Sequence, residues 1–249
     1  MDMKLIPSKT RIIEPPRTNL YEVLDESIKD LRETDVVAVT SKIVAISEGR
    51  YIRMEDIDKD TLVEREAEYI KVQKGRKPLT VVHHALISGA GIDESNGFGH
   101  YVLLPEDPFR SAEEIHEYLT KKFGLEKLGI IITDSHSLPF RYGAMSISIG
   151  CFGFLPVESH IGRKDLFGRV MKYSTLNVAD SLAAACALVS GECDERTPIV
   201  IVRDVPNLMF TKDSPREKLF IPHEEDLYRS LFKDFRQVKK SYRSKVIQE

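Results

Sequence analysis

Three short apolar runs constrain the fold of this chain most strongly. They are rich in β-branched residues and show no polar alternation, which is typical of strands buried on both faces of a sheet. The first leads into Ser41-Lys42 and the second leads into Asp134. The runs are DVVAVT at 35–40, LGIIIT at 128–133 and PIVIVR at 198–203.

Helices are predicted where periodic apolar residues follow a capping residue. Ser111 and Glu114 form a capping-box pattern, and Gly124 stands at the expected stop of that helix. The predicted helices run from Thr18 or Asn19 to about Leu31, over Leu62–Val72, over Ser111–Phe123, from a cap at Asn177 over Val178–Val189, and around Asp226–Val238.

Further strands are predicted over Leu79–Ile87, which contains His83 and His84, over Tyr101–Leu104 and over Ser146–Gly150. Strands and helices alternate only loosely along the chain. We therefore expect a mixed α/β (α+β) fold with mixed sheets, and not a standard doubly wound sheet. Residues 206–249 are charged and are expected to form an extension to the region before them.

Composition excludes several classes of partner. The net charge of −3 implies no general affinity for nucleic acid or an anionic membrane. No apolar run approaches the roughly 20 residues of a membrane span. Three cysteines without a Cys-x-x-Cys pair argue against a disulfide framework or a zinc site, so a cytoplasmic location is the default expectation.

The stretch Ser88–Gly97, SGAGIDESNG, concentrates polar chemistry. It holds Asp93, Glu94 and Asn96, and glycine lets its backbone pass close to a ligand. Carboxylates and an amide in such a turn favour a hard cation or a cation-bound phosphate. The alternative is a solvated Asx turn, which prefers the same residue types.

Three other clusters have a similar ambiguity. Asp134 follows an apolar strand, where metals and phosphates bind in α/β proteins, or it caps a turn. A haloacid dehalogenase phosphatase would need an acid where His136 stands. The loop Ser190–Thr197 contacts a nucleotide or is merely solvated. Lys42 holds a phosphate as a point charge or is likewise merely solvated. Together these clusters suit a metal–nucleotide site.

Several motifs together resemble the coenzyme F420-0:γ-glutamyl ligase family. They occur in the order of the family and cover most of residues 1–205. They are VVAVTSKIVAISEGR at 36–50, AGIDESN at 90–96, LLPEDP at 103–108, GIIITDS at 129–135, IGRKDLFGR at 161–169 and VADSLAAACALVSGECDERTPIVIVR at 178–203. The resemblance implies the unusual α/β fold of that family, with residues 1–205 as the catalytic region (one unit or two intertwined subdomains) and a homodimer.

The resemblance also implies roles for individual residues. Asp93 and Asp134 match the ligands of one divalent metal, Mg²⁺ or Mn²⁺, while Ser135 and Glu192 match the ligands of a second. Lys42 joins Asp93 and Asp134 as a catalytic residue. The positions that match nucleotide contacts are Pro7, Ser41, Lys42, Asn96, Ser190, Gly191, Cys193, Asp194 and Thr197.

The sequence departs from the family pattern in the compact segment between residues 50 and 80, in the tail from 205 onward, which has no counterpart, and at two places within the motifs. Ile46 stands where the family has a second lysine, and His136-Ser137-Leu138-Pro139 replaces a Tyr/Phe-Gly-Arg-Pro segment. These changes are similar to a bacterial branch proposed to glutamylate folates. We expect a GTP- or ATP-dependent ligase that joins the amine of L-glutamate to a small carboxylate acceptor through an acyl phosphate. The alternatives are a metal-dependent phosphohydrolase and a non-catalytic nucleotide-binding protein.

Overall fold

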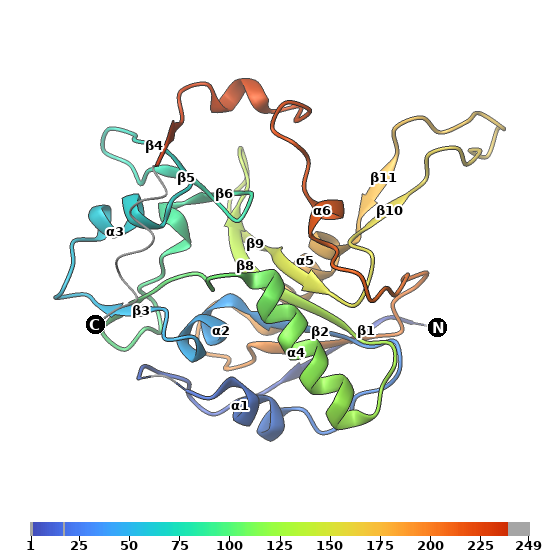
Figure 1. Cartoon of the computed structure of the whole chain (residues 1–249), viewed down its shortest axis with the longest axis horizontal. Coiled ribbons are helices and arrows are strands. Elements are labelled where there is room, and N and C mark those ends of the chain that lie inside the picture. Colours follow the sequence, from blue (N-terminus) through green and yellow to red (C-terminus); the bar gives the residue numbers. More distant parts are fainter. Residues whose placement is uncertain (1, 17, 239–249) are drawn as a thin grey trace.

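The computed structural model describes residues 2–16 and 18–238 and is built around a five-stranded mixed sheet (Figure 1). The strand order is β1-β12-β2-β8-β9. Strands β2 and β8 are parallel and the other neighbours are antiparallel. The strands are β1 (Lys4–Ser8), β2 (Val36–Thr40), β8 (Gly129–Ser137), β9 (Ala144–Phe152) and β12 (Ile199–Arg203).

The two faces of this sheet pack into separate cores because consecutive strand residues point in opposite directions. Val37 and Ile130 lie in the core shared with α1 (Leu20–Ser27) and α4 (Pro108–Phe123). Val36, Ala38 and Ile131 lie in the core shared with α5 (Val178–Ser190). The expectation of a mixed α/β fold built on buried apolar strands is confirmed.

Helix ends follow the capping chemistry, with one correction. Asn19 and Asn177 cap α1 and α5 through their side chains, and Gly124 ends α4 in the left-handed conformation with φ 68°. The cap of α4 is Asp107 and not Ser111, because Pro108 begins the helix one turn earlier. The Ser111 hydroxyl instead donates to Glu48 at 2.6 Å.

A smaller antiparallel sheet, β13-β4-β5-β6, lies beside the main sheet and next to α3 (Lys59–Glu66) (Figure 1). The predicted single strand over Leu79–Ile87 is wrong, because His83 and His84 form a two-residue turn. Their φ angles are 50° and 60°, the left-handed conformation that a tight hairpin requires at both positions. The strands are β4 (Tyr69–Lys71), β5 (Leu79–Val82), β6 (Ala85–Ser88) and β13 (Arg236–Gln237).

Other boundaries also differ from the prediction. Helix α3 ends at Glu66, and the chain then enters β4 in place of a helix to Val72. The strand predicted near Tyr101 is β7 (His100–Val102), which pairs with β3 (Tyr51–Arg53). Helix α2 (Ser41–Ser47), which follows β2 directly, was not expected from the sequence.

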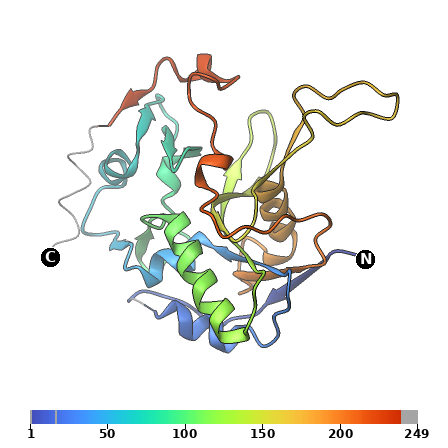
Figure 2. The ribbon, with the colours of Figure 1, turned by 45° about the vertical axis from the view of Figure 1, so that its right-hand side comes forward.

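A hairpin arm projects from the body of the molecule (Figures 1 and 2). Its base is formed by β10 (Val157–Ser159) and β11 (Thr175–Asn177), which pair in an antiparallel manner. Several apolar side chains on the arm are largely exposed, namely Leu166, Phe167 and Tyr173.

The C-terminal segment, residues 206–238, crosses from the main sheet to the smaller sheet (Figures 1 and 2). It contains α6 (Arg216–Leu219) and a 3-10 turn, η2 (Arg229–Phe232), before β13. The helix predicted around Asp226–Val238 is therefore wrong within these residues: β13 pairs with β4 instead. The rest of the predicted extension, residues 239–249, lies outside the described residues.

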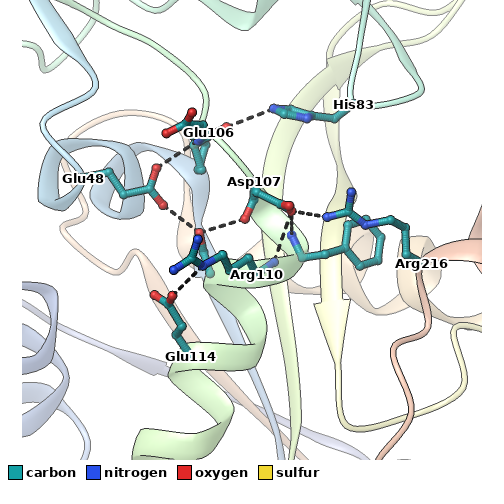
Figure 3. Close-up of polar contacts among 10 residues, drawn as sticks. Glu48, His83, Glu106, Asp107, Arg110, Glu114 and Arg216 are labelled. Atoms are coloured by element: carbon teal, nitrogen blue, oxygen red, sulfur yellow. Dashed lines mark hydrogen bonds and ion pairs between the residues drawn. The ribbon is translucent and has the colours of Figure 1, made fainter. Parts of the chain in front are cut away.

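Contacts at both ends fix this segment. Arg216 forms an ion pair with Asp107 at the start of α4 (Figure 3). The ring of Phe220 stacks on His84 with the ring centroids 4.4 Å apart. Near β13, Arg236 forms an ion pair with Glu64 of α3. Of the described helices, none has the length and apolar character needed to cross a membrane.

Candidate functional site

The site begins where the parallel pairing of β2 with β8 ends. Thr40, the last residue of β2, pairs with Thr133, so Ser41 and Asp134 occupy equivalent positions beyond that pair. The Ser41 hydroxyl donates a hydrogen bond of 2.6 Å to Oδ1 of Asp134. Asp134 lies within β8, which continues to Ser137, and is not a cap of a following turn. The sheet register therefore holds this carboxylate in place.

Lys42 connects α2 to the stretch Ser88–Gly97. Its Nζ lies 2.5 Å from Oδ2 of Asp93 and donates a hydrogen bond of 2.9 Å to the carbonyl oxygen of Ser95. The backbone N–H and the hydroxyl of Ser95 each donate to Oδ1 of Asp93 at 2.8 Å. The predicted alternative of an Asx turn is thus present, and the same carboxylate also pairs with a lysine from another element.

The pKa values of Asp93 and Asp134 are shifted in opposite directions. Burial acts to raise the pKa of Asp93, but the hydrogen bond and charge of Lys42, with the Ser95 donors, lower it below its usual value. Burial is the main cause that raises the pKa of Asp134 to about 7. The Ser41 hydrogen bond and Lys42 oppose this rise, while the charges of Asp93 and Glu192 add to it.

The loop that follows α5 joins the site through Asn96. The Nδ2 of Asn96 donates to the carbonyl oxygen of Cys193 at 2.9 Å, although 97 residues separate them. Within the loop, the Thr197 hydroxyl donates to the carbonyl oxygen of Ser190 at 2.8 Å. Gly191, with φ 72°, turns the chain at the end of α5. The loop after α5 therefore contacts the Asp93 loop through the backbone of Cys193.

The remaining predicted site residues lie at different places relative to Asp93 and Asp134. Glu192 and Asp194 are exposed in the loop, and the charge of Glu192 acts on Asp134. Ser135 is exposed on β8, where it pairs with Ser146 of β9. Pro7 lies on the edge strand β1, opposite Val200.

The oxygen atoms at the site match the preference of Mg²⁺ or Mn²⁺ for hard ligands. Burial, with a smaller contribution from the charges of Asp93 and Glu192, disfavours the ionised form of Asp134, and a nearby cation would favour that form. Within residues 2–16 and 18–238, however, no three His, Cys, Asp or Glu side chains gather as a ready metal site. A cation held by these residues would therefore need further ligands, which a bound phosphate can supply to Mg²⁺.

Two side chains were missed by the sequence reasoning. Ser95 supplies two donors to Asp93, and the D-x-S spacing of an Asx turn is the signal that indicates it. Lys59, on the first turn of α3, forms an ion pair with Glu94. The charged segment around α3 gave no signal for this second contact.

Comparison with known proteins identifies the family of this chain. A sequence model of the F420-0:Gamma-glutamyl ligase family matches residues 8–204. The chain belongs to this family. The family is one of γ-glutamyl ligases, so an enzyme that forms an amide bond is the class of protein indicated.

Three relatives show how similar this γ-glutamyl ligase family member is to known proteins. The Coenzyme F420:L-glutamate ligase of Methanothermobacter thermautotrophicus is 35% identical over 229 residues, which cover 84% of this chain and 90% of the relative. The protein of the same name from Methanopyrus kandleri is 35% identical over 221 residues, or 81% and 87% of the two chains. That from Methanocaldococcus jannaschii is 38% identical over 169 residues, or 68% and 67%.

Proposed function

We propose that this γ-glutamyl ligase is nucleotide- and divalent-metal-dependent and adds L-glutamate to a carboxylate acceptor through an acyl phosphate. The observation that carries the proposal is the contact of Ser41-Lys42 with Asp134 and Asp93, just beyond the last pair of the parallel strands β2 and β8. The relatives that bear the name Coenzyme F420:L-glutamate ligase support F420-0 as an acceptor to test.

The reaction needs activation because a carboxylate is a poor electrophile. An oxygen of the acceptor carboxylate attacks the γ-phosphorus of GTP or ATP, the bond to the β-phosphate oxygen breaks, and the nucleoside diphosphate leaves. The glutamate amine then attacks the carbonyl carbon of the acyl phosphate. Inorganic phosphate leaves, the amine loses a proton, and the new amide remains.

The residues of the chain have distinct parts in this scheme. Lys42 holds negative charge on the nucleotide phosphates, and Asn96 with the Ser190–Thr197 loop borders the nucleotide. Asp93 and Asp134 would hold one Mg²⁺ or Mn²⁺, and Ser135 with Glu192 a second. When bound, these ions neutralise the phosphates and supply electrostatic stabilisation to the transferred group. Ser41, through its hydrogen bond, fixes the orientation of Asp134.

A phosphate-release assay tests the proposal. The protein is incubated with GTP or ATP, Mn²⁺ or Mg²⁺, L-glutamate and either F420-0 or a monoglutamyl folate, and the product mass is measured. We expect phosphate release only with both glutamate and acceptor, together with a product one glutamyl residue heavier. Phosphate release without them would favour a phosphohydrolase, and nucleotide binding without turnover would favour a binding protein.

The folate arm of that assay addresses the altered segment at His136–Pro139. We propose folates as an alternative acceptor class because this segment lies at the end of β8, next to Asp134 and Ser135. Product formed from F420-0 but not from a folate would reject the alternative.

A homodimer is also part of the proposal. The exposed apolar side chains of Leu166 and Phe167 on the hairpin arm suit contact with a second copy. Analytical ultracentrifugation of the unmodified chain and of Leu166→Asp/Phe167→Asp tests this assignment. A monomeric mass for the unmodified chain would reject the dimer, and an unchanged dimer in the variant would place the contact elsewhere.

A further inference from the structure

A cavity of about 690 Å³ lies directly behind the loop that carries Asp93. Helix α3, strand β4 and the segment before β5 form its walls, and Ser88, Gly89, Ile92 and Glu94 close one side. These four residues belong to the same stretch, Ser88–Gly97, that positions Asp93. The cavity and the predicted metal–nucleotide site therefore share a wall.

The cavity lining is mixed, with an apolar part beside charged and polar side chains. Val63, Ile70, Val72, Pro78 and Ile92 supply the apolar part. The volume lies within the range of roughly 300–1,000 Å³ that is typical of sites for organic ligands of cofactor size. L-glutamate has no apolar body that would occupy such walls.

The charges at the cavity favour an anion. Its acids Glu94 and Glu64 are already in ion pairs, with Lys59 and Arg236 respectively.

In contrast, the side chains of Arg76 and Lys77 make no hydrogen bond or ion pair among the described residues, and both are exposed. Asp60 is the lining acid that stays unpaired within the same residues. Arg76 and Lys77 therefore remain for a ligand, opposed by Asp60, although the charge of Lys77 also acts on Glu94.

We propose that this cavity binds the carboxylate acceptor, an organic anion with an apolar or aromatic body. The body would lie against the apolar walls, and its anionic groups would pair with Arg76 and Lys77. The proposal rests on the proposed function, because it identifies the acceptor site of that reaction. It follows from the shared wall that the acceptor would approach the nucleotide from the side of Glu94.

The structure also shows what holds the cavity wall in place. Strand β13 of the C-terminal segment pairs with β4, so that Arg236 lies opposite Ile70. The Arg236–Glu64 ion pair joins the same segment to α3. The C-terminal segment thus contacts both elements that form one side of the acceptor cavity.

Equilibrium dialysis with defined probes tests the proposal directly. The probes are F420-0, a monoglutamyl folate and L-glutamate, each with GDP and Mn²⁺ present. The variant is Arg76→Gln/Lys77→Gln, and the matched control is Lys74→Gln, which removes an exposed lysine of the same loop that does not line the cavity. We expect one acceptor probe to bind the unmodified chain and the dissociation constant to rise at least about tenfold in the double variant, the loss expected for charge-assisted hydrogen bonds.

The control should change that dissociation constant by less than about twofold, as is usual for an isolated surface charge. Equal binding to the double variant and the unmodified chain would overturn the proposal. The same holds if the unmodified chain binds neither acceptor probe, or if the double variant loses L-glutamate alone.

The outcomes that would reject the proposed function differ from those that would reject the cavity as the acceptor site. Phosphate release that does not require glutamate would reject the ligase scheme, while acceptor binding that depends on Arg76 and Lys77 would still assign the cavity. In the opposite case, glutamate-dependent turnover with a KM for the acceptor unaffected in the double variant would retain the ligase and reject the cavity.

Discussion

The hydroxyl of Ser41 donates to the carboxylate of Asp134 at 2.6 Å, across 93 residues of sequence. Both residues lie just beyond the last pair of the parallel strands β2 and β8. The contact joins the Ser-Lys pair to the acid that the family resemblance assigns to a metal. It fixes both the position and the orientation of a carboxylate whose pKa is raised to about 7.

Asp134→Asn should lower turnover by roughly a hundredfold or more, the loss typical of a key electrostatic group. The substitution keeps the size of the side chain and an oxygen that accepts from Ser41, but removes the charge. Because the substitution removes a buried charge, which Asp93 and Glu192 also repel, the melting temperature should stay constant or rise. Phosphate release and thermal unfolding on the same preparation check both expectations. Near-normal turnover would reject the catalytic role.

Nucleotide binding should depend on metal. GTP or ATP at about 100 times its dissociation constant should stabilise the chain by about 2.7 kcal/mol when Mn²⁺ is present. Mn²⁺ alone should shift the melting temperature much less, because no three acidic, His or Cys side chains among the described residues gather as a metal site.

Lys42→Gln should reduce the rise in melting temperature that the nucleotide causes, because it removes the cation beside Asp93. Lys29→Gln is the matched control, because Lys29 is an exposed lysine that bonds to the backbone of Asp25 far from the site. If the nucleotide raised the melting temperature equally after chelation of the metal, this would contradict a metal ion that links the carboxylates to the phosphates.

Asp35→Ala should destabilise the fold by about 3–5 kcal/mol, because it leaves a buried cation without its main partner. Asp35 is 1% exposed at its side chain and receives hydrogen bonds from Nε and Nη2 of Arg203 at 2.9 and 2.7 Å. Asp30, 3.2 Å from Arg203, compensates in part. Urea unfolding measures the change.

The control for that experiment is Asp234→Ala, which removes an exposed ion pair with Lys71. Its effect should be below about 1 kcal/mol, as for most surface pairs. Equal losses in Asp35→Ala and Asp234→Ala would show that the Asp35–Arg203 pair adds nothing to stability beyond that of a surface contact.

His116 should make stability depend on pH. Burial is the main cause that lowers its pKa, opposed by Glu117 and by a hydrogen bond with the backbone of Leu128, and assisted by Lys212. Its contribution is thus complete above the unfolded pKa of 6.5 and is lost as the pH falls through the lower folded value. The ring packs against Phe152 with centroids 5.0 Å apart.

Urea unfolding of the unmodified chain and of His116→Gln across this pH range isolates the effect, because other groups titrate equally in both. The difference in free energy of unfolding between the two proteins should shrink as the pH is lowered. A difference that stays constant with pH would reject the assignment to His116.

The sequence by itself determined the elements whose signals are local. Unbroken apolar runs specified β2, β8 and β12, since such residues gain most when both faces of a strand are buried. Asn19 and Asn177 specified two helix starts, because a side-chain cap needs only residues close in the chain. The order of motifs also identified the family that the comparison shows.

Tertiary structure decided features that depend on distant partners. The hairpin turn at His83 and His84 has no glycine signal, and two histidines adopt left-handed angles there. The predicted helix over residues 226–238 does not form, because the end of this segment pairs with β4 as strand β13. The contact between Asn96 and Cys193, the pair of Lys42 with Asp93 and the cavity beside them arise only when the two sheets and the loop after α5 come together. The sequence thus determined which side chains are present, and the packing of the elements determined which of them come into contact.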